Sequence, residues 1–145
     1  MELLKKYHAD CGFRLLLNES VNITEGNEVI KLVGIENWGN GRFSKYGDLG
    51  KAMSNVGEND FTILLSHDPS HWDEQVVGKT SIDLALAGHT HGMQFGIQIA
   101  GINWSPSKYK YPRWGGLYNE DKQHLYVNRG FGYLGFPGRV GMPPE

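Results

Sequence analysis

Residues 82–92 read IDLALAGHTHG, an apolar run that ends in two histidines enclosed by glycines. Side chains at positions i and i+2 of an extended backbone project to the same side, so His89 and His91 can converge on one small object. The flanking glycines leave room and permit backbone angles that other residues resist. Neutral imidazole is the commonest protein ligand for a metal ion. The pattern therefore predicts a metal site at the end of a buried strand.

A third histidine follows another strand-like run upstream. Residues 61–69 read FTILLSHDP, where a leucine-rich and β-branched run ends in His67 and a turn. Both runs are typical of buried strands in a parallel or mixed sheet. Chemistry in open α/β sheets gathers at the carboxyl ends of the strands, so we expect His67, His89 and His91 to share one site. Asp68 is expected to hold the turn after His67, with a hydrogen bond to a ligand histidine as the alternative, and Thr90 is expected to be structural.

These motifs resemble those of a known family. The segments LLSHDP (residues 64–69) and DLALAGHTHGMQ (83–94) look like the last two metal-binding motifs of the calcineurin-like metallophosphoesterases. The bacterial branch of that family continues with a W-x-P loop, here residues 104–106, and an ending that looks like residues 116–118 and 125–135. The resemblance is close over residues 60–141 and loose before them.

The resemblance implies a hydrolase that cleaves phosphate esters at a two-metal site. Carried over residue by residue, it assigns His67 and His89 to one divalent ion and His91 to the neighbouring ion. Manganese, iron or zinc are the expected metals. A metal-bound hydroxide would be the nucleophile, so no side chain is assigned a catalytic role. The implied fold is α/β, part of a four-layer α/β/β/α sandwich with mixed sheets.

The first half of the family's site has no counterpart in this sequence. The family's early D-x-H, its strand-end G-D and its G-N-H-[DE] motif are missing, and we interpret Gly47-Asp48 and residues 57–60 as turns. Residues 1–145 are therefore expected to form a single domain that corresponds to the C-terminal half of a metallophosphoesterase domain. Three neutral histidines suit one weakly or moderately held ion, so we expect the chain alone to be weakly active or inactive.

Substrate contacts are expected after the last strand-like run. Asn128-Arg129 ends this run beside Gly130, and an arginine at a strand end suits bidentate binding of phosphate. A structural salt bridge of Arg129 is the alternative. His71, near a helix start, is expected at the rim of the site or on the surface.

Composition limits the partners. The 145 residues are 39% hydrophobic and carry a formal net charge of −2, which allows one core but gives no basic field for nucleic acid. No apolar segment approaches the about 18 residues that span a membrane. We expect a phosphate-ester small molecule as partner and a soluble, cytoplasmic location, with tethering or export open for a longer protein.

Two other functions are open at this stage. A mononuclear zinc site with three histidines and an open water position, as lyases and hydratases use, would need no missing half. Alternatively, a half-domain exposes a sheet edge and part of its core, which favours a non-catalytic, self-associating module or a homodimer formed through the sheet edge.

Local patterns predict a short series of elements. A helix is expected over residues 3–11 with Gly12 at its end, then a hairpin with strands at 13–24 and 29–36, and a loop at 37–47. Asp48 is expected to cap a short helix that ends near residue 55. Strands at 61–65, 82–87 and 125–128 and a helix at 70–77 follow.

Overall fold

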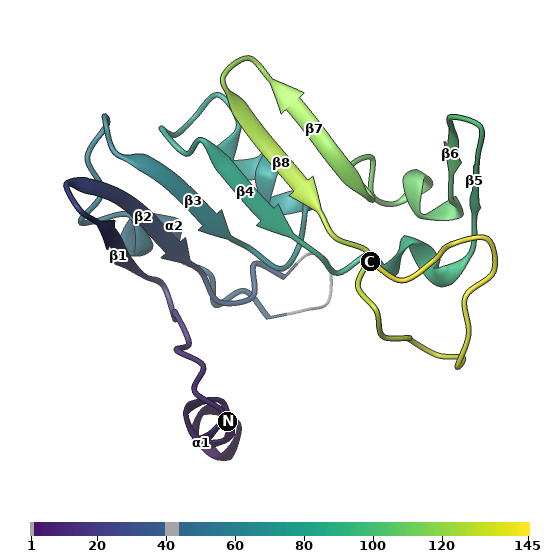
Figure 1. Ribbon diagram of the computed structural model, residues 1–145, viewed down its shortest axis with the longest axis horizontal. Helices are drawn as coiled ribbons and strands as arrows, with labels where there is room; N and C mark the ends of the chain where they lie inside the picture. Colours follow the sequence, from purple (N-terminus) through teal and green to yellow (C-terminus); the bar gives the residue numbers. More distant parts are fainter. Residues whose placement is uncertain (1, 40–43) are drawn as a thin grey trace.

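The computed structural model describes residues 2–39 and 44–145, and Figure 1 shows them as two β-sheets with short helices. The strands are β1 (Glu19–Glu25), β2 (Glu28–Gly34), β3 (Phe61–Leu65), β4 (Leu84–Ala87), β5 (Ile97–Ile99), β6 (Ile102–Trp104), β7 (Gly116–Glu120) and β8 (Gln123–Val127). The helices are α1 (Glu2–Asp10), α2 (Leu49–Ala52), the π-helix η1 (Trp72–Val76) and the 3₁₀ helices η2 (His91–Gln94) and η3 (Pro106–Tyr109).

The larger sheet has six strands in the order β1-β2-β3-β4-β8-β7. Strands β2, β3, β4 and β8 run parallel, whereas the outer strands β1 and β7 are antiparallel to their neighbours. The smaller sheet is the antiparallel pair β5-β6. The predicted α/β fold with a mixed sheet is confirmed, and it is consistent with part of a metallophosphoesterase sandwich.

Several local predictions are confirmed. Helix α1 ends before Gly12, whose φ of 80° is the left-handed conformation that favours glycine at this position. The β1-β2 hairpin pairs Glu25 with Glu28 across a two-residue turn. Asp48 caps α2 because its side chain accepts a hydrogen bond from Lys51 N at 2.9 Å.

Other boundaries differ from the prediction. Strand β1 begins at Glu19 instead of residue 13, and β4 begins at Leu84 instead of residue 82. The strands β5, β6 and β7 were not predicted from the sequence. Residues 40–43 of the predicted loop at 37–47 lie outside the described residues.

The main core lies between the sheet and two helices. Alternate strand residues point toward α2 and η1, which pack on one face of the sheet (Figure 1). This buried cluster consists of Val33, Leu49, Ala52, Leu64, Trp72, Val76, Ile82, Ala85, Leu125 and Val127. It holds the strands in a fixed order and thereby sets where their carboxyl ends meet.

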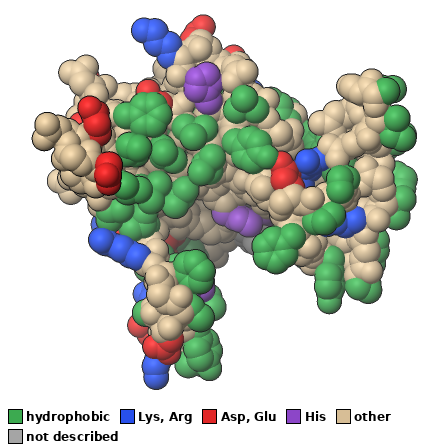
Figure 2. Space-filling model, viewed as in Figure 1, with side chains coloured by type: hydrophobic (Ala, Val, Ile, Leu, Met, Phe, Trp, Pro, Cys, Tyr) green, Lys and Arg blue, Asp and Glu red, His purple; other side chains and the backbone are tan. Residues whose placement is uncertain are grey.

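The opposite face of the sheet carries exposed apolar side chains. Strand pairing places Ile23, Ile30 and Phe61 in one row across this face, and Leu65, Leu86 and Leu117 lie on the same face. Ile23 and Phe61 are about half exposed, at 50% and 51%. Figure 2 shows hydrophobic side chains gathered over the sheet on the side turned to the viewer. We call this surface the open sheet face.

None of the described helices is long and apolar enough to traverse a lipid bilayer. In α1 no residue is buried, and Figure 1 shows this helix standing away from the sheet.

Candidate metal centre

The ends of two neighbouring parallel strands bring His67 and His89 together. Leu65 of β3 pairs with Leu86 of β4, and each histidine follows two residues after its strand. The pairing continues beyond the strands, because Gly88 N donates to His67 O at 3.0 Å. The register of β3 and β4 therefore places the two imidazoles on the same edge of the sheet.

The two imidazoles meet nitrogen to nitrogen. His67 Nε2 lies 3.1 Å from His89 Nδ1, and the ring planes stand at 79° to each other. Two nitrogen ligands at about 2.0–2.1 Å from one ion lie about 2.8–3.4 Å apart when the angle at the metal is between about 90° and 109°. The separation of this pair thus fits two ligands of a single ion.

His91 lies on the same cavity but outside this pair. Its Nδ1 atom is buried and has no hydrogen-bond partner among the described residues. Across residues 2–39 and 44–145, no group of three or more His, Cys, Asp or Glu side chains is arranged to hold a metal. The geometry therefore fits one ion on His67 and His89, with His91 beside it.

The histidines line a cavity of about 530 Å³ at the edge of the sheet. Its lining residues are Asn37, Gly39, His67, Asp68, His89, His91 and Leu134. A neighbouring cavity of about 320 Å³ shares His89, His91 and Leu134, and it also contacts Lys110 and Tyr111. The sequence analysis did not assign Asn37, Leu134, Lys110 or Tyr111 to the site. Leu134 lies in the family-like ending at residues 125–135, whereas Asn37, Lys110 and Tyr111 stand in no motif.

The histidine loop has an unusual backbone. His89, His91, Met93 and Gln94 all have positive φ values, between 49° and 70°. Each such residue other than glycine costs about 1–2 kcal/mol, so other contacts must hold the loop in place.

Two hydrogen bonds from a later segment supply part of this support. Thr90 Oγ1 donates to Trp114 O and Ser105 Oγ donates to Gly92 O, each at 2.6 Å. Thr90 and Ser105 are both buried, which strengthens these bonds because water does not compete for them. Residues 105–114 therefore brace the loop that carries His89 and His91.

The electrostatic environment keeps two of the imidazoles neutral. Burial lowers the pKa of His89, and the nearby Asp68 carboxylate, which favours the charged form, does not offset it. Burial and the cationic Arg139 lower the pKa of His91. Neutral imidazole is the form that coordinates a metal, so both side chains are in the required state at neutral pH.

Asp68 and His71 have structural contacts. Asp68 Oδ1 accepts hydrogen bonds from Ser70 N at 2.9 Å and from Ser70 Oγ at 2.7 Å, which is the expected turn role. His71 is fully buried, with Ser66 and Gln75 as hydrogen-bond partners. The interpretation of His71 as a rim or surface residue was wrong, because its ring packs into the core beneath the site.

The residues expected to contact substrate are engaged elsewhere. Arg129 Nε binds Glu145 Oε2 at 2.6 Å, and Asn128 Oδ1 accepts a hydrogen bond from Gly130 N at 2.7 Å. Neither Asn128 nor Arg129 is among the described residues that line the two cavities. The salt bridge is thus formed, and a phosphate contact by Arg129 or Asn128 stays a prediction.

Arg139 is a further cation that the sequence analysis did not single out. Its guanidinium donates to Arg129 O at 2.9 Å, to Gly132 O at 2.8 Å and to His91 O at 3.4 Å. These bonds hold the glycine-rich tail beside the histidine loop.

Known sequences support the family relationship. The chain is 28% identical to the uncharacterized metallophosphoesterase YkoQ of Bacillus subtilis (strain 168), over 98% of this chain and 50% of the relative. It is 29% identical to the phosphodiesterase YaeI of Escherichia coli (strain K12), over 92% of this chain and 46% of the relative. A transmembrane protein with metallophosphoesterase domain from Bos taurus is 33% identical over 68% of this chain and 21% of the relative.

The chain therefore belongs to the calcineurin-like metallophosphoesterases, the family that its motifs indicate. The chain spans half or less of the length of these curated relatives. No family model matches the chain, and neither does any solved structure. Divalent metal ions are implied by the family, and the pair His67–His89 is the part of this chain that fits such an ion.

Proposed function

We propose that this chain forms part of the metal centre of a divalent-metal-dependent phosphoesterase. The observation that carries the proposal is the 3.1 Å separation between His67 Nε2 and His89 Nδ1, at the carboxyl ends of adjacent parallel strands. The cavity beside them, about 530 Å³, has room for a small phosphate ester.

The three histidines have separate roles in this proposal. His67 and His89 would hold one divalent ion, and His91 would serve as a ligand of a second ion. Manganese, iron and zinc suit imidazole ligands. Such ions, when bound, would supply positive charge for the phosphoryl oxygens and a water of lowered pKa. The chain's own part is to present neutral imidazoles from a braced backbone.

The described residues supply only part of the ligands that two cations need. Imidazoles carry no negative charge, and the carboxylate that lines the cavity, Asp68, already binds Ser70. Two adjacent divalent ions repel each other, and anionic ligands between them are needed to offset this repulsion. We therefore propose that the chain alone binds one ion and has weak activity or none.

The mononuclear zinc alternative finds less support. A three-histidine site needs three nitrogens around one ion, whereas the structure brings only His67 and His89 to ligand spacing among its described residues. The geometry thus favours the phosphoesterase proposal.

Hydrolysis of a bis-aryl phosphate tests the proposal. The chain is assayed with manganese or zinc beside the variants His89→Ala and His124→Ala. His124 is a matched control because it pairs with Leu84, the first residue of β4, whereas His89 follows the other end of that strand. Any metal-dependent hydrolysis should vanish in His89→Ala and persist in His124→Ala. Measurable metal-dependent hydrolysis that is equal in wild type and His89→Ala would contradict the proposal. If the wild type shows no hydrolysis, the metal bound per chain in wild type and His89→Ala decides in its place.

A further inference from the structure

Tyr111 contacts His89 on the side away from His67. The Tyr111 hydroxyl oxygen lies 2.6 Å from His89 Nε2, and the two rings meet edge to face at 85°. His89 Nδ1 faces His67 at 3.1 Å. Both ring nitrogens of His89 therefore have a defined partner, one on the metal side and one on the Tyr111 side.

The proton of a neutral imidazole can sit on only one of these nitrogens. A nitrogen that binds a metal must offer its lone pair, so the proton has to be on the other nitrogen. If Nδ1 of His89 is the ligand atom, Nε2 carries the hydrogen and donates it to the nearest acceptor. The phenolic oxygen of Tyr111 is that acceptor.

We propose that Tyr111 is a positioning residue for His89. Its hydroxyl oxygen accepts a hydrogen bond from Nε2–H of His89, so the lone pair of His89 Nδ1 stays directed toward His67. This inference rests on the proposed metal centre. Hydrogen bonds to the outer nitrogen of a metal-binding histidine fix both its ring orientation and its tautomer. Tyr111 contacts no reacting atom itself and acts only through His89.

The chain holds Tyr111 in place from several directions. Its ring is buried with Trp114 and Met142 in a small second core. Tyr111 N donates to Ser107 O at 2.8 Å, at the end of η3. The hydroxyl position is therefore set by packing rather than by His89.

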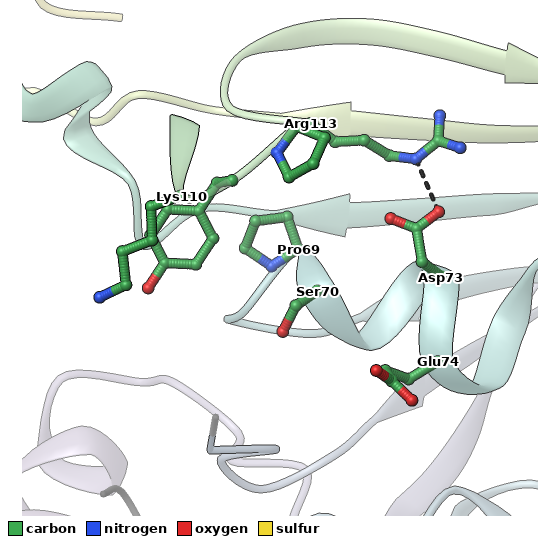
Figure 3. Close-up of a pocket in the computed structure, with 8 residues that line it drawn as sticks. Pro69, Ser70, Asp73, Glu74, Lys110 and Arg113 are labelled. Carbon is green, nitrogen blue, oxygen red and sulfur yellow. Dashed lines mark hydrogen bonds and ion pairs between the residues drawn. The ribbon is translucent and has the colours of Figure 1, made fainter. Parts of the chain in front are cut away.

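A salt bridge anchors the same segment to the body of the protein. Arg113 Nε binds Asp73 of η1 at 3.0 Å, as Figure 3 shows, and Arg113 Nη2 binds Glu120 at 2.8 Å. A cavity of about 160 Å³ lies between η1 and residues 110–113 at this point. Together with the Thr90–Trp114 bond, these contacts make residues 105–114 a fixed support for His89.

The variant Tyr111→Phe removes the hydroxyl and keeps the ring. We expect it to bind manganese or zinc about 10–100-fold more weakly than wild type in calorimetric titrations of the full chain near pH 8, which is what loss of such a supporting bond costs. Tyr109→Phe is the matched control, because Tyr109 belongs to the same segment and is 77% exposed. Its metal affinity should equal that of wild type.

A second readout needs no metal. Nitrogen-15 NMR of the metal-free chain at about pH 8, well above the usual histidine pKa of about 6.5, reports which nitrogen of His89 is protonated. We expect the Nε2–H tautomer in wild type and in Tyr109→Phe, and a mixture of tautomers in Tyr111→Phe. This signature distinguishes positioning of His89 from a general loss of packing.

The outcomes separate this inference from the proposed function. A predominant Nδ1–H tautomer in wild type, or unchanged affinity and tautomer in Tyr111→Phe, would overturn the role of Tyr111. If wild type binds no metal but its Nε2–H tautomer is lost in Tyr111→Phe, the metal centre fails while the positioning contact stands. If Tyr111→Phe does not fold by circular dichroism, the wild-type tautomer alone decides.

Discussion

The Nε2 atom of His67 and the Nδ1 atom of His89 lie 3.1 Å apart, although 22 residues separate them in the sequence. The parallel register of β3 and β4 produces this contact, since Leu65 pairs with Leu86. A metal site on this pair depends on both side chains equally, and His91 contributes from beside the pair.

The variants His67→Ala and His91→Ala distinguish a pair from a triad. Loss of His67 removes one of two ligands on the same ion, so affinity for zinc should fall by more than the about 10–100-fold that a supporting hydrogen bond contributes. Loss of His91 should reduce the affinity of this first ion far less. Calorimetric titration of both variants and of His124→Ala measures the difference. Equal losses in His67→Ala and His91→Ala would instead indicate three ligands on one ion.

Acid should destabilise the chain through His71. Burial lowers the pKa of this side chain, and the opposing effects of the Gln75 hydrogen bond and of Asp68 do not reverse the shift. The unfolded chain therefore takes up this proton first as the pH falls. The contribution of His71 to stability is complete above the usual pKa of about 6.5 and is lost below it, down to the pKa in the folded state.

Urea unfolding at about pH 7.5 and pH 5.5 measures this loss. The free energy of unfolding should decrease at the lower pH in wild type and in His124→Gln. In His71→Gln the decrease should be smaller, because no imidazole has to stay neutral inside the core. A decrease of the same size in His71→Gln would show that other groups cause the acid sensitivity.

The salt bridge between Arg129 and Glu145 restrains the side chain that we expect to contact phosphate. Glu145 accepts hydrogen bonds from the Arg129 side chain at 2.6 Å and from Arg129 N at 3.1 Å. The variant Glu145→Gln removes the charge and should lower the free energy of unfolding by about 1.5–3 kcal/mol, the range for hydrogen bonds to charged groups.

The same variant tests the predicted substrate contact. Once Glu145 no longer neutralises Arg129, inorganic phosphate should bind more tightly to the metal-loaded chain. The double variant Glu145→Gln, Arg129→Gln should lose this gain. Phosphate affinity that is the same in Glu145→Gln and in wild type would assign Arg129 a purely structural role.

The open sheet face should cause association of the isolated chain. The open sheet face carries exposed apolar side chains, and such surfaces on soluble proteins are typical of interaction sites. In a purified sample the available partner for this surface is a second copy of the chain. We propose that copies pair through this face, with pairing through the sheet edge as the competing arrangement. Light scattering after gel filtration should show a dimer or larger species for wild type.

A charge on the open sheet face discriminates between the two arrangements. Phe61→Glu places a carboxylate in the row with Ile23 and Ile30 and should shift the chain toward monomer. Tyr109→Glu, at an exposed position off the large sheet, should leave the association unchanged. Persistent dimers of Phe61→Glu would favour the sheet edge, and a monomeric wild type would refute association altogether.

The parts of the fold that the sequence predicted have a strong local signal. Strand β3 coincides with the predicted range because five apolar or β-branched residues end at a turn. Strand β7, with the sequence GLYNE, has no such pattern and exists because it pairs with β8. The pair β5-β6 consists of three-residue strands, which are too short for periodicity to reveal.

The candidate site was only partly predictable for the same reason. The histidines stand in short motifs at strand ends, so their placement followed from the pattern of strands. Tyr111 stands in no motif, and its contact with His89 arises from the tertiary packing of residues 105–114. The left-handed backbone of Met93 and Gln94 also depends on tertiary contacts, since neither residue type favours it.

The amount of metal bound per chain tests the central claim most directly. Wild type and the double variant His67→Ala, His89→Ala are dialysed to equilibrium against manganese or zinc at about pH 8, where imidazole is neutral, and the metal in excess of the dialysis buffer is measured. The account predicts about one ion per wild-type chain, held by this pair, and none in the double variant. A wild type that retains no ion, or a double variant that retains as much as wild type, would contradict it.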